Sequence, residues 1–175
     1  MSTADSASRM RKASPPPTVE ELREIGLFGA LCDEVLEHLA HTLETRWVQS
    51  GETIFREGDA AHDMFVVLEG EVEVLKQTRQ KHDHRVAILG PKDSCGEMSL
   101  VDVRPRSASV RSLAPTRLLR VTSEDFDRLY RHDLKSYALV TLNIARDLSR
   151  RLRVADGILA DFTANVLDHY VKPRS

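Results

Sequence analysis

Three features are scarce in this sequence. No apolar run approaches the roughly 18 residues that a membrane-spanning helix needs. Cys32 and Cys95 are the only cysteines, too few for a secreted disulfide framework or, without histidines, for a zinc site. There is no basic excess either, since 25 Lys and Arg face 27 Asp and Glu for a net charge of −2, which disfavours a dedicated nucleic-acid binder. We therefore expect a cytoplasmic protein with reduced thiols and no membrane contact.

Enzyme signatures are missing as well. No Gly-rich phosphate loop is present, and no Ser/His/Asp or Cys/His set stands out for nucleophilic catalysis. We expect no enzymatic activity and no cofactor. A chain of 175 residues favours one domain with tails. Residues 1–17, rich in Ser, Ala and Pro, are predicted to be a disordered arm, residues 18–156 the domain, and residues 157–175 a C-terminal helical extension.

Helical patterns flank the middle of the chain. Thr18 before two glutamates is typical of a helix start, and a second helix is expected from Asp33. Ser123 is the predicted N-cap of a further helix. A long apolar stripe then runs in steps of three or four, with at most a break near Gly157. Its members are Leu134, Ala138, Leu142, Ala145, Leu148, Leu152, Ala155, Leu159, Phe162, Val166 and Tyr170.

Short β-type runs separated by turn residues fill residues 46–121. They lie around Trp47, 54–55, 64–68, 72–74, 86–89, 107–113 and 117–121. Closely spaced short strands with Gly turns indicate a sandwich or barrel, and jelly rolls are built this way. The predicted fold class is therefore mainly β with flanking α: a jelly-roll β-roll, cupin-like in its double-stranded β-helix, with N-terminal helices and long C-terminal helices.

One segment, residues 95–110, departs from plain strand alternation. Gly96 permits unusual backbone geometry, and residues 97–100 fit one helical turn whose free N–H groups suit a phosphate. Arg106, after Pro105, begins an alternating strand and is able to clamp a phosphate with two N–H bonds. Ser107 adds a hydroxyl, and Glu97 is suited to accept a hydrogen bond from a sugar hydroxyl. From these residues alone, a surface turn with an ordinary Glu97–Arg106 ion pair is the favoured interpretation, because surface ion pairs are common.

The same segment resembles the phosphate-binding cassette of cyclic nucleotide-binding domains, the modules of protein kinase A regulatory subunits, cyclic nucleotide-gated channels and bacterial catabolite activators. Residues 96–100 (GEMSL) and 105–108 (PRSA) match the family pattern, in which Gly-Glu-Leu-Ala-Leu is followed by Pro-Arg and small residues. Residues 51–59 and 63–72 resemble the glycine-marked first half of the same β-roll, and residues 25–28 its first helix. The departures are Cys95 for an aromatic residue, Ser99 for a small apolar one, and Lys92 where glycine is common.

The resemblance implies roles for individual residues. It assigns Glu97 to the ribose 2′-hydroxyl and Arg106 to the exocyclic phosphate oxygens. Gly96 and Ser99 would contribute backbone N–H groups, Ser107 a hydroxyl contact, and Met98 completes the predicted ligand-binding set. The ligand is expected to be a cyclic nucleotide, cAMP ahead of cGMP, and binding is expected to move the stripe from Leu148 to Phe162 as a lid.

Two other clusters are given different interpretations. The sequence His82-Asp83-His84 is reminiscent of the metal-binding pattern of cupin enzymes, but its polar neighbours favour a solvated hairpin tip. Arg146, Arg150, Arg151 and Arg153 form a basic helical patch. We interpret it as a solvated face with acidic partners, with docking of an acidic protein as the alternative.

The expected function is a receptor that signals to an unidentified effector protein. Direct DNA binding is disfavoured, since only 18 residues follow Gly157 and a helix-turn-helix needs more. The C-terminal stripe approximates a heptad and is also a candidate homodimer seam. The rival interpretations are a ligand-less β-roll interaction scaffold, a cupin-like metal enzyme, and a cyclic di-GMP receptor.

Overall fold

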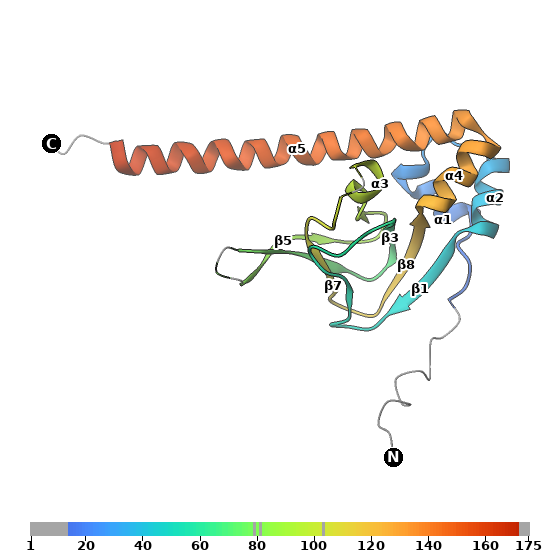
Figure 1. Ribbon diagram of the computed structural model, residues 1–175, viewed down its shortest axis with the longest axis horizontal. Coiled ribbons are helices and arrows are strands. Elements are labelled where there is room, and N and C mark those ends of the chain that lie inside the picture. The colour runs from blue at the N-terminus through green and yellow to red at the C-terminus, as the bar shows by residue number, and fades with distance from the viewer. Residues whose placement is uncertain (1–13, 79, 81, 103, 172–175) are drawn as a thin grey trace, which may run out of the picture.

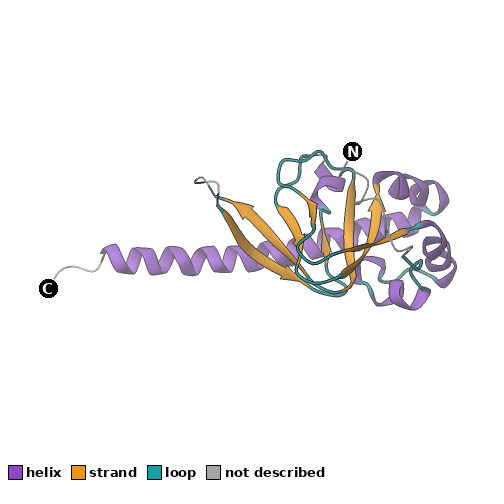
Figure 2. Ribbon diagram, turned by 90° about the horizontal axis from the view of Figure 1, so that it is seen from below, coloured by secondary structure: helices purple, strands orange, loops and turns teal. Residues whose placement is uncertain are grey.

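The computed structural model describes the backbone of residues 14–78, 80, 82–102 and 104–171, with side chains as far as Val166. Residues 1–13 of the predicted arm and the last four residues lie outside this description. The described part contains two four-stranded antiparallel sheets packed face to face (Figure 2). Their strand orders are β1-β8-β3-β6 and β2-β7-β4-β5. The strands are β1 (Glu44–Val48), β2 (Thr53–Phe55), β3 (Asp63–Glu69), β4 (Val72–Gln77), β5 (Asp83–Leu89), β6 (Ser94–Cys95), β7 (Ser109–Ser112) and β8 (Thr116–Thr122). The predicted β-roll is confirmed.

Helices gather at one end of the roll, where both termini of the domain meet (Figure 1). They are α1 (Val19–Glu24), the short 3₁₀ helix η1 (Gly26–Phe28), α2 (Asp33–Thr42), α4 (Ser123–His132) and α5 (Leu134–Val171), while the one-turn α3 (Met98–Asp102) lies in the roll. Thr18 caps α1 as predicted, because its hydroxyl accepts from the N–H of Glu21. The N-cap of α4 is Thr122, one residue before the predicted Ser123, because the Thr122 hydroxyl and the Asp125 carboxylate each accept from the other's backbone N–H.

Two cores share strands β3 and β8. Successive side chains of a strand point to opposite faces, so Met64 and Val66 pack under the helices, whereas Phe65 and Val67 pack between the sheets. All four are at most 3% exposed. Because a one-residue slip would exchange the two sets, this double burial holds β3 in register and thereby places Asp63, its first residue.

The long helix α5 has two unequal parts. Near its start, Val140 and Ile144 are buried against the helices at the end of the roll, and the Asn143 amide donates to the carbonyls of Leu27 and Gly29 at 3.1 and 3.0 Å. Residues 152–166 of the helix are exposed, and its C-terminal part projects beyond the roll as an isolated rod (Figure 1). It runs unbroken through Gly157. No described helix combines the length and apolar character that crossing a membrane requires.

Candidate ligand-binding site

The predicted cassette lies between β6 and β7 and is organised by a glycine. Gly96 has φ +82°, and a Cβ at this position would overlap Nη1 of Arg106. A side chain is therefore excluded both by backbone conformation and by space. This close approach lets the Gly96 carbonyl accept from Arg106 Nη1 at 3.1 Å, so the two ends of the cassette are joined directly.

Arg106 is 5% exposed and is held on several sides. Nη1 also donates to the Asp63 carbonyl at 2.6 Å, and Nη2 donates to the Asp63 carboxylate. The guanidinium carbon lies 4.0 Å from the ring centroid of Phe55, a cation–π arrangement. Nε is buried and has no partner among the described residues. The guanidinium is thus oriented while keeping donor capacity for an anion, because it carries five N–H groups.

The charge on Arg106 is only partly balanced. Asp63 is its acidic contact, and the same carboxylate also accepts from Arg120 Nε at 2.7 Å. Arg120 has a second, exposed partner in Glu44 at 3.8 Å, but Arg106 has none beyond Asp63 in the described part of the chain. One carboxylate therefore serves two guanidinium groups. The surroundings of Arg106 keep an excess of positive charge, which suits them to bind an anion.

Glu97 lies at the opposite end of the cassette and is 4% exposed. Burial raises the pKa of its carboxyl group, against the opposing effect of the nearby Arg151 charge. Oε1 lies 3.2 Å from Arg151 Nη1, and Oε2 is buried without a hydrogen-bond partner among the described residues. A buried acceptor without a donor is costly, so this oxygen is suited to receive a ligand hydroxyl.

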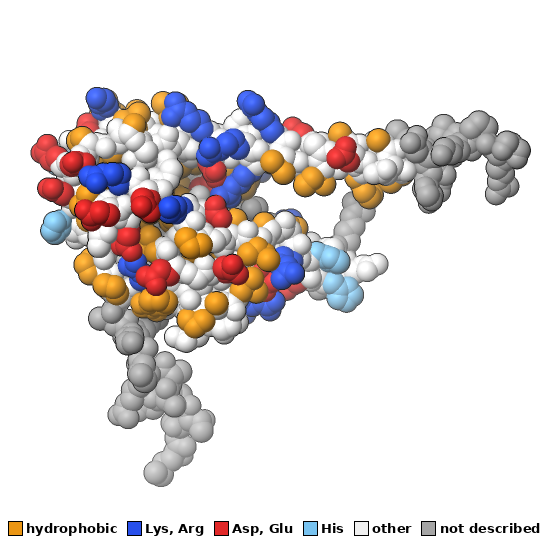
Figure 3. Space-filling model, turned by 180° about the vertical axis from the view of Figure 1, so that it is seen from behind, with side chains coloured by type: hydrophobic (Ala, Val, Ile, Leu, Met, Phe, Trp, Pro, Cys, Tyr) orange, Lys and Arg blue, Asp and Glu red, His pale blue; other side chains and the backbone are white. Residues whose placement is uncertain are grey.

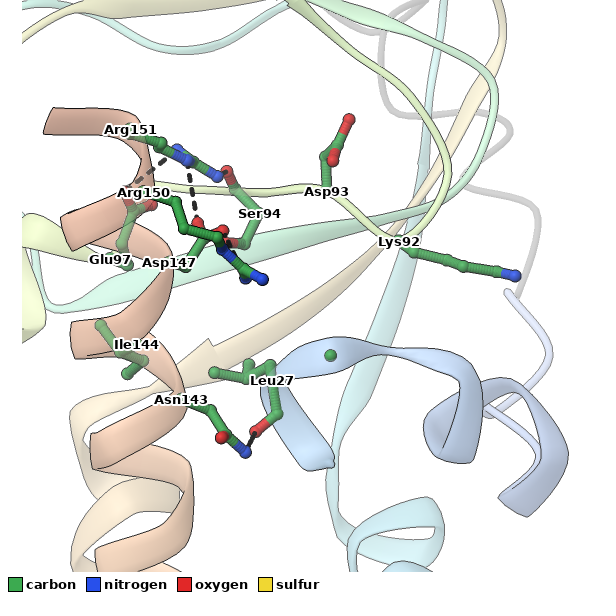
Figure 4. A pocket seen from close by; sticks show the side chains of 11 residues that line it. Leu27, Lys92, Asp93, Ser94, Glu97, Asn143, Ile144, Asp147, Arg150 and Arg151 are labelled. Carbon is green, nitrogen blue, oxygen red and sulfur yellow. Dashed lines mark hydrogen bonds and ion pairs between the residues drawn. The ribbon is translucent and has the colours of Figure 1, made fainter. Parts of the chain in front are cut away.

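Arg151 connects α5 to the cassette (Figure 4). Besides its contact with Glu97, Nη2 donates to the Ser94 carbonyl at 2.7 Å, and Nε lies 2.8 Å from the Asp147 carboxylate. The side chain is 39% exposed. Arg151 therefore differs from Arg150, 74% exposed, and the interpretation of the patch as one solvated face does not hold for Arg151.

The other predicted ligand-binding residues lie around α3. Ser99 is buried, and its N–H donates to the Gly96 carbonyl at 3.3 Å, a long bond that a ligand would have to share. Met98 and Ser107 are exposed, with the Ser107 hydroxyl 3.7 Å from the Met98 sulfur. The structure joins Gly96 to Arg106 directly, buries the side chains of Glu97 and Arg106, and leaves Met98 and Ser107 exposed.

A cavity of about 150 Å³ borders the site on the side of α5 (Figure 4). Glu97, Asp147 and Arg151 line it together with Leu27 of η1 and Asp93 before β6. Small-molecule sites usually measure about 300–1,000 Å³. This cavity therefore suits ordered water better than a nucleotide.

The two thiols have different environments. Cys95, next to Gly96, is buried, and burial raises its thiol pKa to about 12. It is therefore an apolar packing group rather than a nucleophile. Cys32 is exposed just before α2. Among the described residues, no group of three or more His, Cys, Asp or Glu side chains is placed to hold a metal ion, and His82-Asp83-His84 lies where β5 begins.

Sequence reasoning missed three residues that shape the site: Asp63, Phe55 and Arg151. Asp63 and Phe55 belong to the resemblance in the first half of the roll, but nothing in their neighbourhood marks them as contacts of Arg106. For Arg151, a signal was available in its spacing of four from Asp147, which favours an ion pair along a helix.

Comparisons with known proteins agree with this geometry. The family profile "Cyclic nucleotide-binding domain" matches residues 45–133. The chain is 35% identical over 130 residues to the Cyclic AMP receptor protein of Thermus thermophilus, covering 74% of this chain and 58% of that protein. It is 36% identical over 94 residues to the cAMP-dependent protein kinase regulatory subunit of Dictyostelium discoideum, covering 52% and 29%.

A solved structure with the same fold is a cyclic nucleotide-binding domain from Methylobacillus flagellatus. It has a TM-score of 0.75 and 28% identity, with 82% of this chain and 83% of that chain covered. The match spans about three fifths of the first two curated relatives, at 58% and 62% of their lengths.

Proposed function

Because this chain belongs to the cyclic nucleotide-binding domain family, we propose that it is a non-enzymatic receptor for a 3′,5′-cyclic nucleotide, with cAMP preferred over cGMP. The observation that carries the proposal is a matched pair of buried, unpartnered atoms among the described residues: the donor Nε of Arg106 and the acceptor Oε2 of Glu97. They lie at the two ends of one glycine-organised segment. A ligand with an anionic group beside a sugar hydroxyl would satisfy both.

Arg106 would bind the cyclic phosphate. Asp63 and the Gly96 carbonyl already fix the plane of its guanidinium, so little side-chain entropy remains to be lost on binding. Its excess positive charge, buried and therefore weakly screened, would be neutralised by the phosphate. Phe55 would continue to support the opposite face of the guanidinium.

Glu97 would accept a hydrogen bond from the ribose hydroxyl. Burial penalises its ionised form, and a hydroxyl donor to Oε2 would reduce that penalty. The Glu97 contact would discriminate against 2′-deoxy analogues, because these would leave the buried acceptor Oε2 unpaired.

The same carboxylate supports a mechanism for signalling. Arg151 of α5 contacts Glu97 Oε1, so a ribose hydroxyl on Oε2 would share one carboxylate with the guanidinium of α5. A ligand that interacts differently with two positions of α5 shifts the population between them. The stripe from Leu148 to Phe162 would move as a lid and present the change to an effector protein.

Ligand identity rests on the relatives. The names of two of them refer to cAMP, which supports cAMP over cGMP, while Ser107 at the rim is compatible with either purine. A cyclic di-GMP receptor and a ligand-less scaffold are the alternatives, and each gives a different outcome in the titration that follows.

The test is isothermal titration of the protein with cAMP, cGMP and cyclic di-GMP, comparing Arg106→Ala with Arg104→Ala. Arg104 is 81% exposed, so its variant makes the same chemical change two residues away outside the buried site. Loss of the Arg106 contact should cost about 2–5 kcal/mol of binding free energy, whereas Arg104→Ala should bind like the wild type. No heat with any nucleotide from folded protein would favour the scaffold, and selective heat with cyclic di-GMP would change the ligand.

A homodimer is part of the same proposal. Leu152, Leu159 and Val166 recur every seven residues on the projecting part of α5, and Ala155 and Phe162 fall between them in the heptad pattern. These side chains are exposed, the three largest by 61%, 62% and 65% for Leu152, Leu159 and Phe162. We name these five residues the α5 seam; a second copy offers a matching surface that would cover it.

A further inference from the structure

We propose that an arginine-rich face of α5, turned away from the α5 seam, binds an acidic helix of a partner protein. The face consists of Arg146, Arg150 and Arg153, and we name it the basic face. Spacings of four and three residues place the three side chains within about 60° of one another around the helix. Figure 3 shows Lys and Arg side chains along the upper edge of the molecule, where α5 leaves the body of the roll.

The basic face is open to solvent. Arg150 is 74% exposed, and Arg146 and Arg153 are exposed as well. Val140 and Ile144, which anchor α5 against the helices at the end of the roll, lie roughly a third of a turn away around the helix. The α5 seam points in roughly the opposite direction. A partner on the basic face therefore leaves the seam accessible.

The positive charge of the basic face is not neutralised within the described part of the chain. Arg146 donates to an uncharged side-chain amide oxygen at 2.9 Å, and Arg153 makes no ion pair with the described residues. Arg150 lies 3.2 Å from the Asp147 carboxylate, which it shares with Arg151. Like charges three and four residues apart also destabilise a helix. An acidic partner would relieve this repulsion.

Exposed arginines elsewhere have acidic partners of their own. Arg23 contacts Asp33 at 2.7 Å. Arg131 contacts Asp127 at the same distance. The whole chain has a net charge of −2, so the positive charge on one side of α5 does not follow from overall composition. For the basic face we therefore favour docking of an acidic protein over a solvated surface with acidic neighbours.

The spacing of the arginines and their surroundings define the partner. A helix with Asp or Glu at spacings of four and three would bring one carboxylate to each guanidinium, and a guanidinium can bind a carboxylate through two N–H groups. Leu142 lies on the same side of α5, one turn before Arg146, and is 50% exposed. It offers an apolar contact that suits a protein rather than a phosphate backbone. The net negative charge also opposes attraction to a nucleic acid.

Asp147 links the basic face to the candidate ligand site. Its carboxylate contacts Arg150 and also Arg151, which in turn contacts Glu97. A partner that takes Arg150 leaves Asp147 to Arg151 alone, and this weakens the contact of Arg151 with Glu97. A ribose hydroxyl on Glu97 would offset that loss, so partner and nucleotide should strengthen each other's binding by the same factor. This coupling rests on the proposed function, whereas the docking itself does not.

Docking is tested with a fluorescent, alanine-rich helical peptide that carries Glu at spacings of four and three. A second peptide with Gln at the same positions is the control for charge. By fluorescence anisotropy at low ionic strength, we expect the wild type to bind the Glu peptide at least about tenfold more tightly than the Gln peptide. A triple variant of the basic face should lose this preference. Its substitutions are Arg146→Glu, Arg150→Glu and Arg153→Glu.

A second triple variant separates docking from net charge. It makes the same change at three exposed arginines outside the basic face, with Arg23→Glu, Arg104→Glu and Arg131→Glu, and it should bind the Glu peptide like the wild type. Circular dichroism checks that both variants are folded. A Lys peptide that binds the basic-face variant but not the wild type would confirm direct pairing of charges.

Two results overturn the docking of an acidic helix. The first is equal binding of the Glu and Gln peptides by the wild type, or an equal loss of Glu peptide binding in the two triple variants. The second is tighter binding of a mixed-sequence DNA duplex than of the Glu peptide, lost only in the basic-face variant, which would make the partner a nucleic acid.

The coupling is tested by repeating the Glu peptide measurement with saturating cAMP. We expect cAMP to tighten peptide binding by the wild type about fivefold. Arg150→Gln keeps the other two arginines of the face but removes the link through Asp147, so cAMP should leave its peptide affinity unchanged. Equal tightening in both proteins overturns the link. If the isothermal titration shows no cAMP binding, the receptor proposal fails, and the peptide measurements without nucleotide still decide the docking.

Discussion

The packed half of α5 (residues 136–151) and its projecting half (residues 152–166) carry apolar side chains of similar size, but only the packed half buries them. Val140 and Ile144 are at most 3% exposed, whereas Leu159 and Phe162 exceed 60%. The difference lies in what surrounds each half, since the helices at the end of the roll cover the first and nothing described covers the second. A continuous helix can therefore combine a structural anchor with a surface kept for another molecule.

Arg151 marks the junction between the halves. Among the described side chains of α5, it is the last that contacts the cassette region, through Glu97 and the Ser94 carbonyl. Any displacement of the projecting half thus begins next to the candidate ribose acceptor. The junction is polar, and polar contacts exchange partners at lower cost than a packed apolar interface does.

The largest expected effect is the difference in unfolding free energy between a substitution in the packed half of α5 and one in its projecting half. Ile144→Ala should lower the free energy of unfolding by about 2–5 kcal/mol, because it leaves a cavity in a close-packed core. Leu159→Ala, on the exposed seam, should change it by less than about 0.5 kcal/mol. Urea denaturation at low protein concentration, where self-association contributes least, measures both. Similar losses in the two variants would contradict the division of α5 into a packed and a projecting half.

A smaller effect concerns the junction. Arg151→Ala should lower the free energy of unfolding by about 1–3 kcal/mol, because Glu97 would remain buried without its cationic neighbour. Arg150→Ala is the matched control: its ion pair with Asp147 is exposed, and such pairs contribute about 0–1 kcal/mol. Denaturation of both variants under identical conditions gives the comparison. Equal effects would show that the contact of Arg151 with the cassette adds nothing to stability.

The smallest effect lies within the projecting half. Gly157 sits in the helix interior, and a Cβ there would meet no atom within 4 Å. Gly157→Ala should stabilise the helix locally by about 0.8 kcal/mol, which slows amide hydrogen exchange around residue 157 about fourfold. Ala160→Gly, the reverse change one turn further on, should accelerate exchange by a similar factor. If Gly157→Ala leaves exchange unchanged, the helix here is already held by a second copy.

Much of the fold follows from local pattern. The short β-type run of residues 64–68 between turn residues predicted β3, and steps of three or four predicted α5, because both signals depend on neighbours along the chain. The two-residue strand β6 was not predicted, since Ser94 and Cys95 are too few to show a period. The cap of α4 was displaced by one residue, because Thr122 and Ser123 both offer a hydroxyl and only Thr122 faces the Asp125 backbone.

The candidate site could be predicted only in its contiguous part. Residues 96–107 carry their own signature, and the resemblance to cyclic nucleotide-binding domains is confirmed. Asp63 of β3 contacts Arg106 from 43 residues earlier in the chain. Arg151 of α5 contacts Glu97 from 54 residues later. Such contacts depend on how the two sheets and α5 pack against one another, and this packing cannot be predicted from the spacing of residues along the sequence. The ligand roles of Gly96, Glu97 and Arg106 stay predictions for the titration to decide.

Because the two thiols differ in exposure and pKa, the protein has a single site for selective thiol labelling. At neutral pH a maleimide reacts with the thiolate, which Cys95, buried and with a pKa of about 12, hardly forms, while Cys32 stands exposed. A fluorescent dye would therefore attach at one defined point, at the end of the roll where α5 is anchored. Fluorescence of a dye on Cys32 would therefore report movement of α5 without any change to the sequence.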